Sequence, residues 1–131
     1  MSEKAIFASF YDEKFRPLNT DFKQITTDWQ MRKIGDRLEI NDHRDFEYDF
    51  SVLDRLDRLH EQVRALKDDL VSILPECCGY LDRLERAKKR LDDLDYRFFT
   101  GTDVDSYHMV WFEMHDYVLR KLGKERGEDE V

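Results

Sequence analysis

The longest regular pattern of hydrophobic positions in the chain runs from residue 52 to residue 98. Apolar residues recur there at steps of four and three, which is typical of helices that pack through a seven-residue repeat. This seam consists of Val52, Leu56, Leu59, Val63, Leu66, Leu70, Ile73, Cys77, Tyr80, Leu84, Ala87, Leu91, Leu94 and Phe98. The pattern predicts α-helix whose apolar stripe is covered by another helix, in the same chain or in a second copy.

Two helix-breaking residues interrupt this stretch. Inside a helix, Pro75 would cost about 3 kcal/mol and Gly79 about 1 kcal/mol relative to alanine. We therefore favour a turn at 75–79 that folds the two helices into an antiparallel hairpin. The alternative is one long kinked helix covered by a second chain, since the step of four from Ile73 to Cys77 keeps the repeat in phase.

The ends of the helices carry their own signals. Ser51, with Asp54 three residues later, resembles a capping box and predicts that the first helix begins there. A C-terminal helix is expected over 103–123, with Asp103, Asp105 or Ser106 as its cap and Gly123 as its end. The acidic residues 124–131 are expected to form a disordered tail.

The first forty residues are read as strands. The aromatic-rich run 4–11 and the near-alternating run 22–34 both favour β-structure. Gly35-Asp36 predicts a tight turn, which gives a hairpin of Trp29–Ile34 with Arg37–Asn41. We expect four aromatic residues of this β-meander to lie in the core, namely Phe7, Phe10, Phe22 and Trp29.

The predicted fold is α+β and helix-dominated, with a small N-terminal antiparallel β-meander packed on a coiled-coil-like helical hairpin and a C-terminal helix. At 131 residues the chain has the size of one domain, which we place at 1–123. Within it we expect the meander at 1–41, an acidic-aromatic connector at 42–50, the heptad helices at 51–99 and the C-terminal helix at 103–123.

The connector contains the candidate binding residues. Acidic and aromatic side chains alternate along it, and such a segment can dock on a basic, partly apolar groove of another protein. The candidates are Asp42, Asp45, Phe46, Glu47, Tyr48 and Asp49, together with Trp111 on the unusually apolar C-terminal helix. In the alternative interpretation, the segment only connects two elements and lays Phe46 and Phe50 on the core.

Charge and cysteine content restrict the possible partners and the compartment. The net charge is −8, made up of −3 over residues 1–50, −1 over 51–99 and −4 over 100–131. An acidic chain does not favour direct binding to nucleic acid, so a protein with a basic surface is the expected partner. No apolar run approaches the roughly 20 residues of a membrane span. The two adjacent cysteines favour a reducing compartment, and we expect a cytoplasmic protein.

Candidate chemistry is sparse. Two histidines seven residues apart, His108 and His115, are too far apart to share a metal ion by themselves. Cys77 is more typical of a buried apolar residue than of a nucleophile. We therefore expect no catalytic residue, cofactor or metal.

Three functional hypotheses follow from these observations. We favour a non-enzymatic protein–protein interaction module, with a homodimer as a possible assembly. The first alternative is an acidic inhibitor or nucleic-acid mimic that blocks a basic groove of a nucleic-acid-handling protein. The second is a small enzyme or metal protein.

Overall fold

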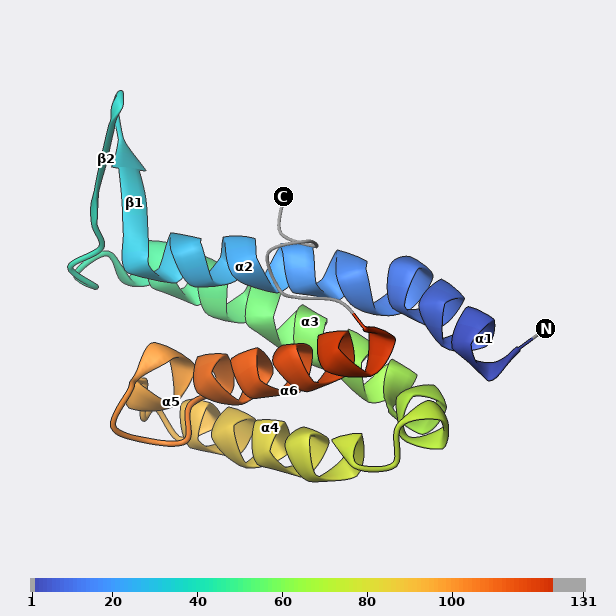
Figure 1. Ribbon diagram of the computed structural model, residues 1–131. Helices are drawn as coiled ribbons and strands as arrows, with labels where there is room; N and C mark the ends of the chain where they lie inside the picture. Colours follow the sequence, from blue (N-terminus) through green and yellow to red (C-terminus); the bar gives the residue numbers. More distant parts are fainter. Residues whose placement is uncertain (1, 124–131) are drawn as a thin grey trace. The chain divides into compact units, whose positions relative to one another are not determined.

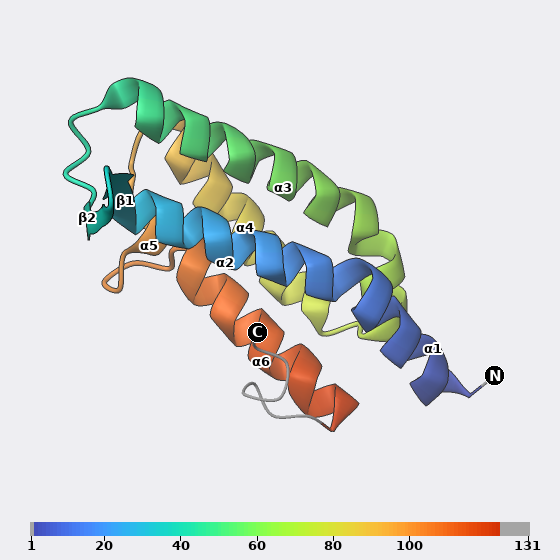
Figure 2. The same ribbon diagram turned by 90° about the horizontal axis from the view of Figure 1, so that it is seen from above.

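The computed structural model describes residues 2–123, and the chain divides into two compact units (Figures 1 and 2). Residues 11–66 form the unit that we call the hairpin unit. Residues 2–10 and 67–123 belong to the second, which we call the helical unit. The fold is α+β and helix-dominated, as predicted. The units subdivide the predicted domain, and the predicted tail at 124–131 lies outside the described residues.

The hairpin unit contains a two-stranded antiparallel sheet between helices. Its elements are the π-helical turn η1 (Tyr11–Phe15), α2 (Arg16–Gln30), β1 (Met31–Ile34), β2 (Arg37–Ile40) and most of α3 (Phe46–Ile73). Ile34 pairs with Arg37, and between them Gly35 has a φ of +62°, which glycine adopts without steric cost. The predicted hairpin is therefore confirmed, and Figure 1 shows it projecting away from the end of α2.

The two longer strand predictions are wrong, because both runs are helical. Residues 4–11 fall in α1 (Glu3–Phe10) and the start of η1, and 22–30 fall in α2. Their buried apolar residues recur at steps of three and four, whereas a strand would repeat every two. These residues are Phe7, Tyr11, Phe15, Leu18, Phe22, Ile25 and Trp29. Three of the four aromatic residues predicted for the core are thus buried, and Phe10 is half-buried.

Helix α3 begins at Phe46 and not at the predicted Ser51. Its cap is Asp45, whose side-chain Oδ1 accepts a hydrogen bond from the backbone N–H of Tyr48 at 3.2 Å. The Asp45 carbonyl accepts the first helical bond, from the N–H of Asp49. The hydroxyl of Ser51 instead donates to the Tyr48 carbonyl inside the helix. A stronger cap upstream therefore adds more than one turn to the helix.

The helical stretch breaks at Leu74–Glu76, which confirms the predicted turn at Pro75 but not its extension to Gly79, because Cys77–Gly79 already belong to the next helix. Helix α3 ends at Ile73 and α4 (Cys77–Asp92) begins after Pro75. The N–H of Cys77 donates to the Leu74 carbonyl at 3.0 Å, which closes the turn. One continuous kinked helix is thereby excluded.

The helical unit contains α1, the end of α3, α4, α5 (Arg97–Thr100) and α6 (Tyr107–Leu122). Helices α4 and α6 pack together and run in opposite directions, with α5 between them in the chain (Figure 1). The predicted second helix ends earlier than expected, at Asp92. Leu94 adopts a φ of +70°, and the N–H of Asp95 donates to the Arg90 carbonyl, which is a Schellman ending. Leu94 consequently leaves the seam and is 71% exposed.

An arginine links α4 to α6. The guanidinium of Arg83 donates to Asp105 Oδ1 and to Glu113 Oε2, both at 2.6 Å. These hydrogen bonds lower the pKa of the Asp105 carboxyl below its ordinary value. One forked side chain thus connects α4 to α6 and to the loop that precedes it.

Helix α6 has the ends that the sequence predicts. The Ser106 side chain accepts from the N–H of Met109 and donates to the Gly101 carbonyl at 2.8 Å. At the other end Gly123 has a φ of +77°, the left-handed backbone conformation that ends the helix. Of the three predicted cap residues, Ser106 is the one in place.

Replacing Ser106 by alanine should lower the free energy of unfolding by about 1–2 kcal/mol, because the buried cap loses both hydrogen bonds. Urea denaturation of the full chain measures this. The matched control is Ser72→Ala, an exposed position inside α3, which should change stability by less than about 0.5 kcal/mol. Equal losses in the two variants would contradict the capping role.

Candidate protein-binding surface

A hydrogen-bond cluster, which we call the Asp49 cluster (Asn41, His43 and Asp49), links the predicted acidic-aromatic segment to the residue before it. Its Asn41 and Asp49 side chains are buried, and the His43 side chain is 41% exposed. The Asn41 amide Nδ2 donates to Asp49 Oδ1 at 2.8 Å and to the Trp29 carbonyl at 2.9 Å. His43 Nδ1 lies 2.9 Å from Asp49 Oδ2. Because an ionised carboxylate only accepts hydrogen bonds, His43 is the donor. Asn41 and Asp49 therefore belong to the interior and not to a free surface.

The loop before α3 is shaped by the same cluster. His43 has a φ of +59°, a left-handed conformation that is uncommon for a residue with a side chain. Two contacts hold it there: its N–H donates to Asn41 Oδ1 at 3.1 Å, and its ring lies 4.4 Å from that of Trp29 between centroids. The cluster therefore fixes the path of the chain from β2 into α3.

Tyr48 is also held within the hairpin unit. Its hydroxyl donates to the carbonyl of Asp28 at 2.6 Å, and the guanidinium of Arg32 lies 4.2 Å from its ring centroid. Burial, followed by the charge of Asp28, raises the pKa of the Tyr48 phenol. Arg32 in turn pairs with Asp45 at 3.2 Å, so the aspartate that caps α3 is neutralised as well.

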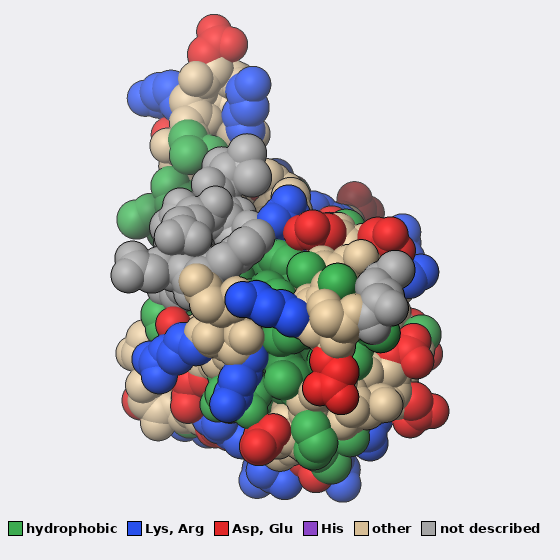
Figure 3. All heavy atoms as spheres, turned by 45° about the vertical axis from the view of Figure 1, so that its right-hand side comes forward, with side chains coloured by type: hydrophobic (Ala, Val, Ile, Leu, Met, Phe, Trp, Pro, Cys, Tyr) green, Lys and Arg blue, Asp and Glu red, His purple; other side chains and the backbone are tan. Residues whose placement is uncertain are grey.

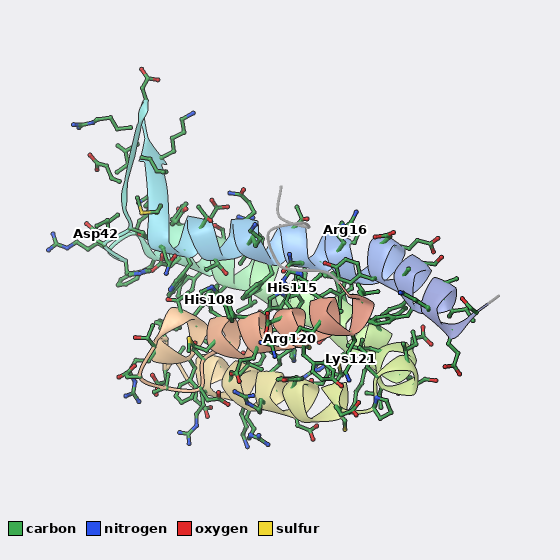
Figure 4. The ribbon with its side chains drawn as sticks, viewed as in Figure 1. Arg16, Asp42, His108, His115, Arg120 and Lys121 are labelled. Carbon is green, nitrogen blue, oxygen red and sulfur yellow. The ribbon has the colours of Figure 1, made fainter. Side chains whose placement is uncertain are left out.

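The structure therefore divides the seven predicted binding residues. Asp45, Tyr48 and Asp49 make contacts inside the unit, and Trp111 is buried, with 3% of its surface exposed. Asp49 and Trp111 are buried and do not lie on the described surface, and partner binding by the seven residues stays a prediction. Asp42, Asp45, Phe46 and Glu47 are exposed to solvent, and Asp45 also pairs with Arg32. Asp42 lies in the loop at the base of the hairpin (Figure 4).

The aromatic residues of the segment are the unexpected part of the surface. Phe46 is 68% exposed and Phe50 59% exposed, so the alternative that lays them on the core is wrong. The hairpin adds three more exposed apolar side chains, of Ile34, Leu38 and Ile40. Figure 3 shows the hairpin with charged side chains near its tip and hydrophobic ones nearer its base.

No protein-family model, curated protein or solved structure matches the chain. The site must therefore be interpreted from its own geometry. Of the large hydrophobic residues that the structure describes as exposed, nine in all, five lie between residues 34 and 50. Solvent-facing apolar side chains gathered in one short segment are typical of a binding surface.

A helical-wheel pattern could have revealed the two phenylalanines. Along α3 the interior positions are Val52, Leu56 and Leu59, whereas Phe46, Phe50 and Leu53 share a second stripe at i, i+4 and i+7. The predicted connector at 42–50 conceals this pattern, because it places the helix start at Ser51. Once α3 begins at Phe46, both phenylalanines fall on its outer side.

Residues 2–123 contain no cluster of metal ligands and no candidate membrane span. Within 2–123 no three His, Cys, Asp or Glu side chains group so as to hold a metal ion. His108 and His115 lie along α6, as Figure 4 shows, and His115 is buried. None of the helices described in this range has the length and apolar character needed to cross a membrane.

Cys77 is poorly suited to nucleophilic chemistry. Burial, and to a lesser extent the charge of Glu76, raise the pKa of its thiol to about 12. The thiol is therefore protonated at neutral pH, and only the thiolate is a good nucleophile. Its neighbour Cys78 is exposed.

Replacing Asp49 by alanine should lower the free energy of unfolding by about 2–3 kcal/mol, because the Asn41 amide and the His43 ring lose a buried acceptor. Urea denaturation measures the loss, and faster amide exchange of β1 and β2 would locate it. Asp54→Ala is the control. This exposed carboxylate pairs with Arg58 and should contribute only about 0.3–0.5 kcal/mol. Similar losses for both variants would argue against the Asp49 cluster.

The two cysteines should differ in reactivity. In a Cys78→Ser variant, the remaining thiol of Cys77 should not react with a thiol-specific chromogenic reagent until urea unfolds the chain. The matched Cys77→Ser variant should react in the native state. Rapid labelling of native Cys77 would show that its pKa is not raised.

Proposed function

We propose that the chain is a non-enzymatic interaction module that binds a partner protein through the outer side of α3. We call this surface the α3 stripe and define it as Phe46, Phe50 and Leu53. The observation that carries the proposal is the exposure of two phenylalanines one helical turn apart, at 68% and 59%. Burying an aromatic side chain in a partner is worth about 1–3 kcal/mol, so two such anchors support specific binding.

Helix α3 has one side that is buried in the protein and another that exposes the stripe. Asp49, Val52 and Leu56 are buried, with at most 6% of their surface exposed. The α3 stripe lies on a different side of the helix, because its residues recur at i, i+4 and i+7 from Phe46. This spacing is the one by which an amphipathic helix enters an apolar groove of another protein.

The side chains beside the stripe define the chemistry of the partner. Glu47 and Asp54 are exposed on the same turns of α3 as the phenylalanines. A groove with apolar pockets and basic residues along its rim would complement both. This agrees with the basic partner surface expected from the net charge of −8.

The Asp49 cluster supports binding by holding the stripe in place. It fixes the first turns of α3 against β2 and the end of α2, within one unit. A surface that is rigid before binding loses less conformational entropy when the partner arrives. The capped helix is therefore better suited to binding than a flexible connector would be.

The nucleic-acid mimic stays a prediction, and no contact favours it. Residues 31–45 carry four basic and four acidic side chains, so the hairpin and the loop after it have no net charge as a segment. Two carboxylates of the acidic-aromatic segment, Asp45 and Asp49, are already paired with Arg32 and His43. The enzyme hypothesis is likewise untested. For the location we propose the cytoplasm, since both cysteines are free thiols.

The test begins with capture of the partner. A photo-crosslinking amino acid at Glu47, beside the α3 stripe, should yield a discrete adduct with another protein in cells. The same group at Glu61, an exposed position further along α3, should not. Mass spectrometry of the adduct identifies the partner for purification.

Titration calorimetry with the purified partner then tests the anchors. Phe46→Ala/Phe50→Ala should weaken binding at least tenfold, because the two aromatic contacts are lost. Leu94→Ala removes an equally exposed side chain from the helical unit and should leave binding unchanged. Unchanged affinity of the double variant would rule out the α3 stripe as the binding surface.

A further inference from the structure

The outer edge of strand β2 has no strand paired to it in the two-stranded sheet. In a two-stranded sheet each strand pairs on one side only, and the register joins Arg32 to Glu39 and Ile34 to Arg37. Because Ile34 and Arg37 flank a two-residue turn, these two pairs exchange the ladder hydrogen bonds. The backbone N–H and C=O groups of Leu38 and Ile40 therefore point outward along the free edge of β2.

The side chains of β2 alternate between two faces. Leu38 and Ile40, at 63% and 81% exposure, lie on one face. Arg37 and Glu39 lie on the other, and their side chains are 3.5 Å apart. An edge with outward backbone groups, exposed apolar side chains and one charge of each sign is suited to pairing with another strand.

We propose that two copies of this chain associate through their β2 edges, as antiparallel strands related by a twofold axis at Leu38. This inference goes beyond the α3 stripe and does not rest on it. In this register Leu38 faces Leu38 of the partner subunit, and their outward groups form two backbone hydrogen bonds. Arg37 faces Glu39 of the partner subunit, and the symmetry gives this ion pair twice. The result is a four-stranded antiparallel sheet.

Charge complementarity favours the β2 edge over the β1 edge, and it favours the register with the axis at Leu38. It also favours a second copy of the chain as the partner at this edge. On the β1 edge, the central residues are Arg32 and Lys33, so twofold antiparallel pairing would place one of them opposite its own copy. On β2, moving the twofold axis by one residue, from Leu38 to Glu39, would place the Glu39 side chains of the two copies opposite each other. Like charges directly opposite are destabilising. Only the axis at Leu38 places opposite charges together.

The dimer also joins apolar surface. Met31 pairs with Ile40 and shares its face with Leu38. In the four-stranded sheet these faces of the two copies become continuous across the central strands. Cross-strand contacts between apolar side chains add to the stability of such a sheet.

Sedimentation velocity of the full chain over a concentration series tests the association. The wild-type chain should show a concentration-dependent monomer–dimer equilibrium. Arg37→Glu and Glu39→Arg should each weaken dimerisation at least tenfold, because each places two like-charged pairs across the axis. An equimolar mixture of these two variants should recover the dimer, since every Arg then faces a Glu.

A pair of proline variants separates the two edges. Leu38→Pro removes an outward N–H on β2 and should abolish the dimer, while the N–H lost is not part of the hairpin ladder. Lys33→Pro removes the equivalent outward N–H on β1 and should leave the dimer intact. Circular dichroism should show the same helix content in both variants.

Three results would overturn the proposal. One is a wild-type chain that stays monomeric at every concentration. Another is a dimer that withstands Arg37→Glu and Leu38→Pro. The third is loss of the dimer in Lys33→Pro to the same extent as in Leu38→Pro.

Discussion

The buried carboxylate of Asp49 is the constraint on which the hairpin unit depends. A charge taken out of water must be matched by hydrogen-bond donors, or its burial costs several kcal/mol. Asn41 and His43 supply those donors, and the Asn41 amide also reaches the Trp29 carbonyl. A single side chain thereby joins the end of α2, the residue after β2 and the start of α3. The left-handed backbone at His43 follows from this requirement.

The start of α3 carries a buried side and two exposed phenylalanines. Asp49 and the seam residues that follow it occupy the inner side of the helix. Phe50, one residue after Asp49, is turned about 100° from it around the helix axis, and Phe46, one turn before Asp49, lies at the edge of the inner side. Both phenylalanines are exposed, and exposed aromatic side chains gathered on one helix are typical of a binding surface.

Helical periodicity made about half of the fold predictable. The seam from Val52, the break at Pro75 and both ends of α6 follow from apolar spacing and from local capping chemistry, which act within a few residues. The N-terminal helices were missed, because aromatic and β-branched residues favour strands when they are judged singly. Their spacing by three and four was the better signal, since burial in a helix depends on period and not on residue type.

The candidate site was only partly predictable, for a different reason. The sequence indicates that residues 42–50 mix carboxylates with aromatics, but it does not indicate which carboxylate is buried. That depends on contacts between residues eight or more positions apart in the chain, such as Asp49 with Asn41 and Arg32 with Asp45. The outward groups of β2 depend likewise on the pairing register.

The two proposed surfaces have different roles: the β2 edge joins two chains, and the α3 stripe binds the partner protein. A β2–β2 dimer carries two copies of the α3 stripe, one from each chain. If a partner presents its groove twice, the second binding event becomes intramolecular, and the overall affinity can rise by 10²–10⁴ without a new contact. A weak edge-to-edge association can therefore have a large effect on binding. The exposed hairpin and the exposed helix then serve one function, in which the edge sets the number of sites and the α3 stripe sets their specificity.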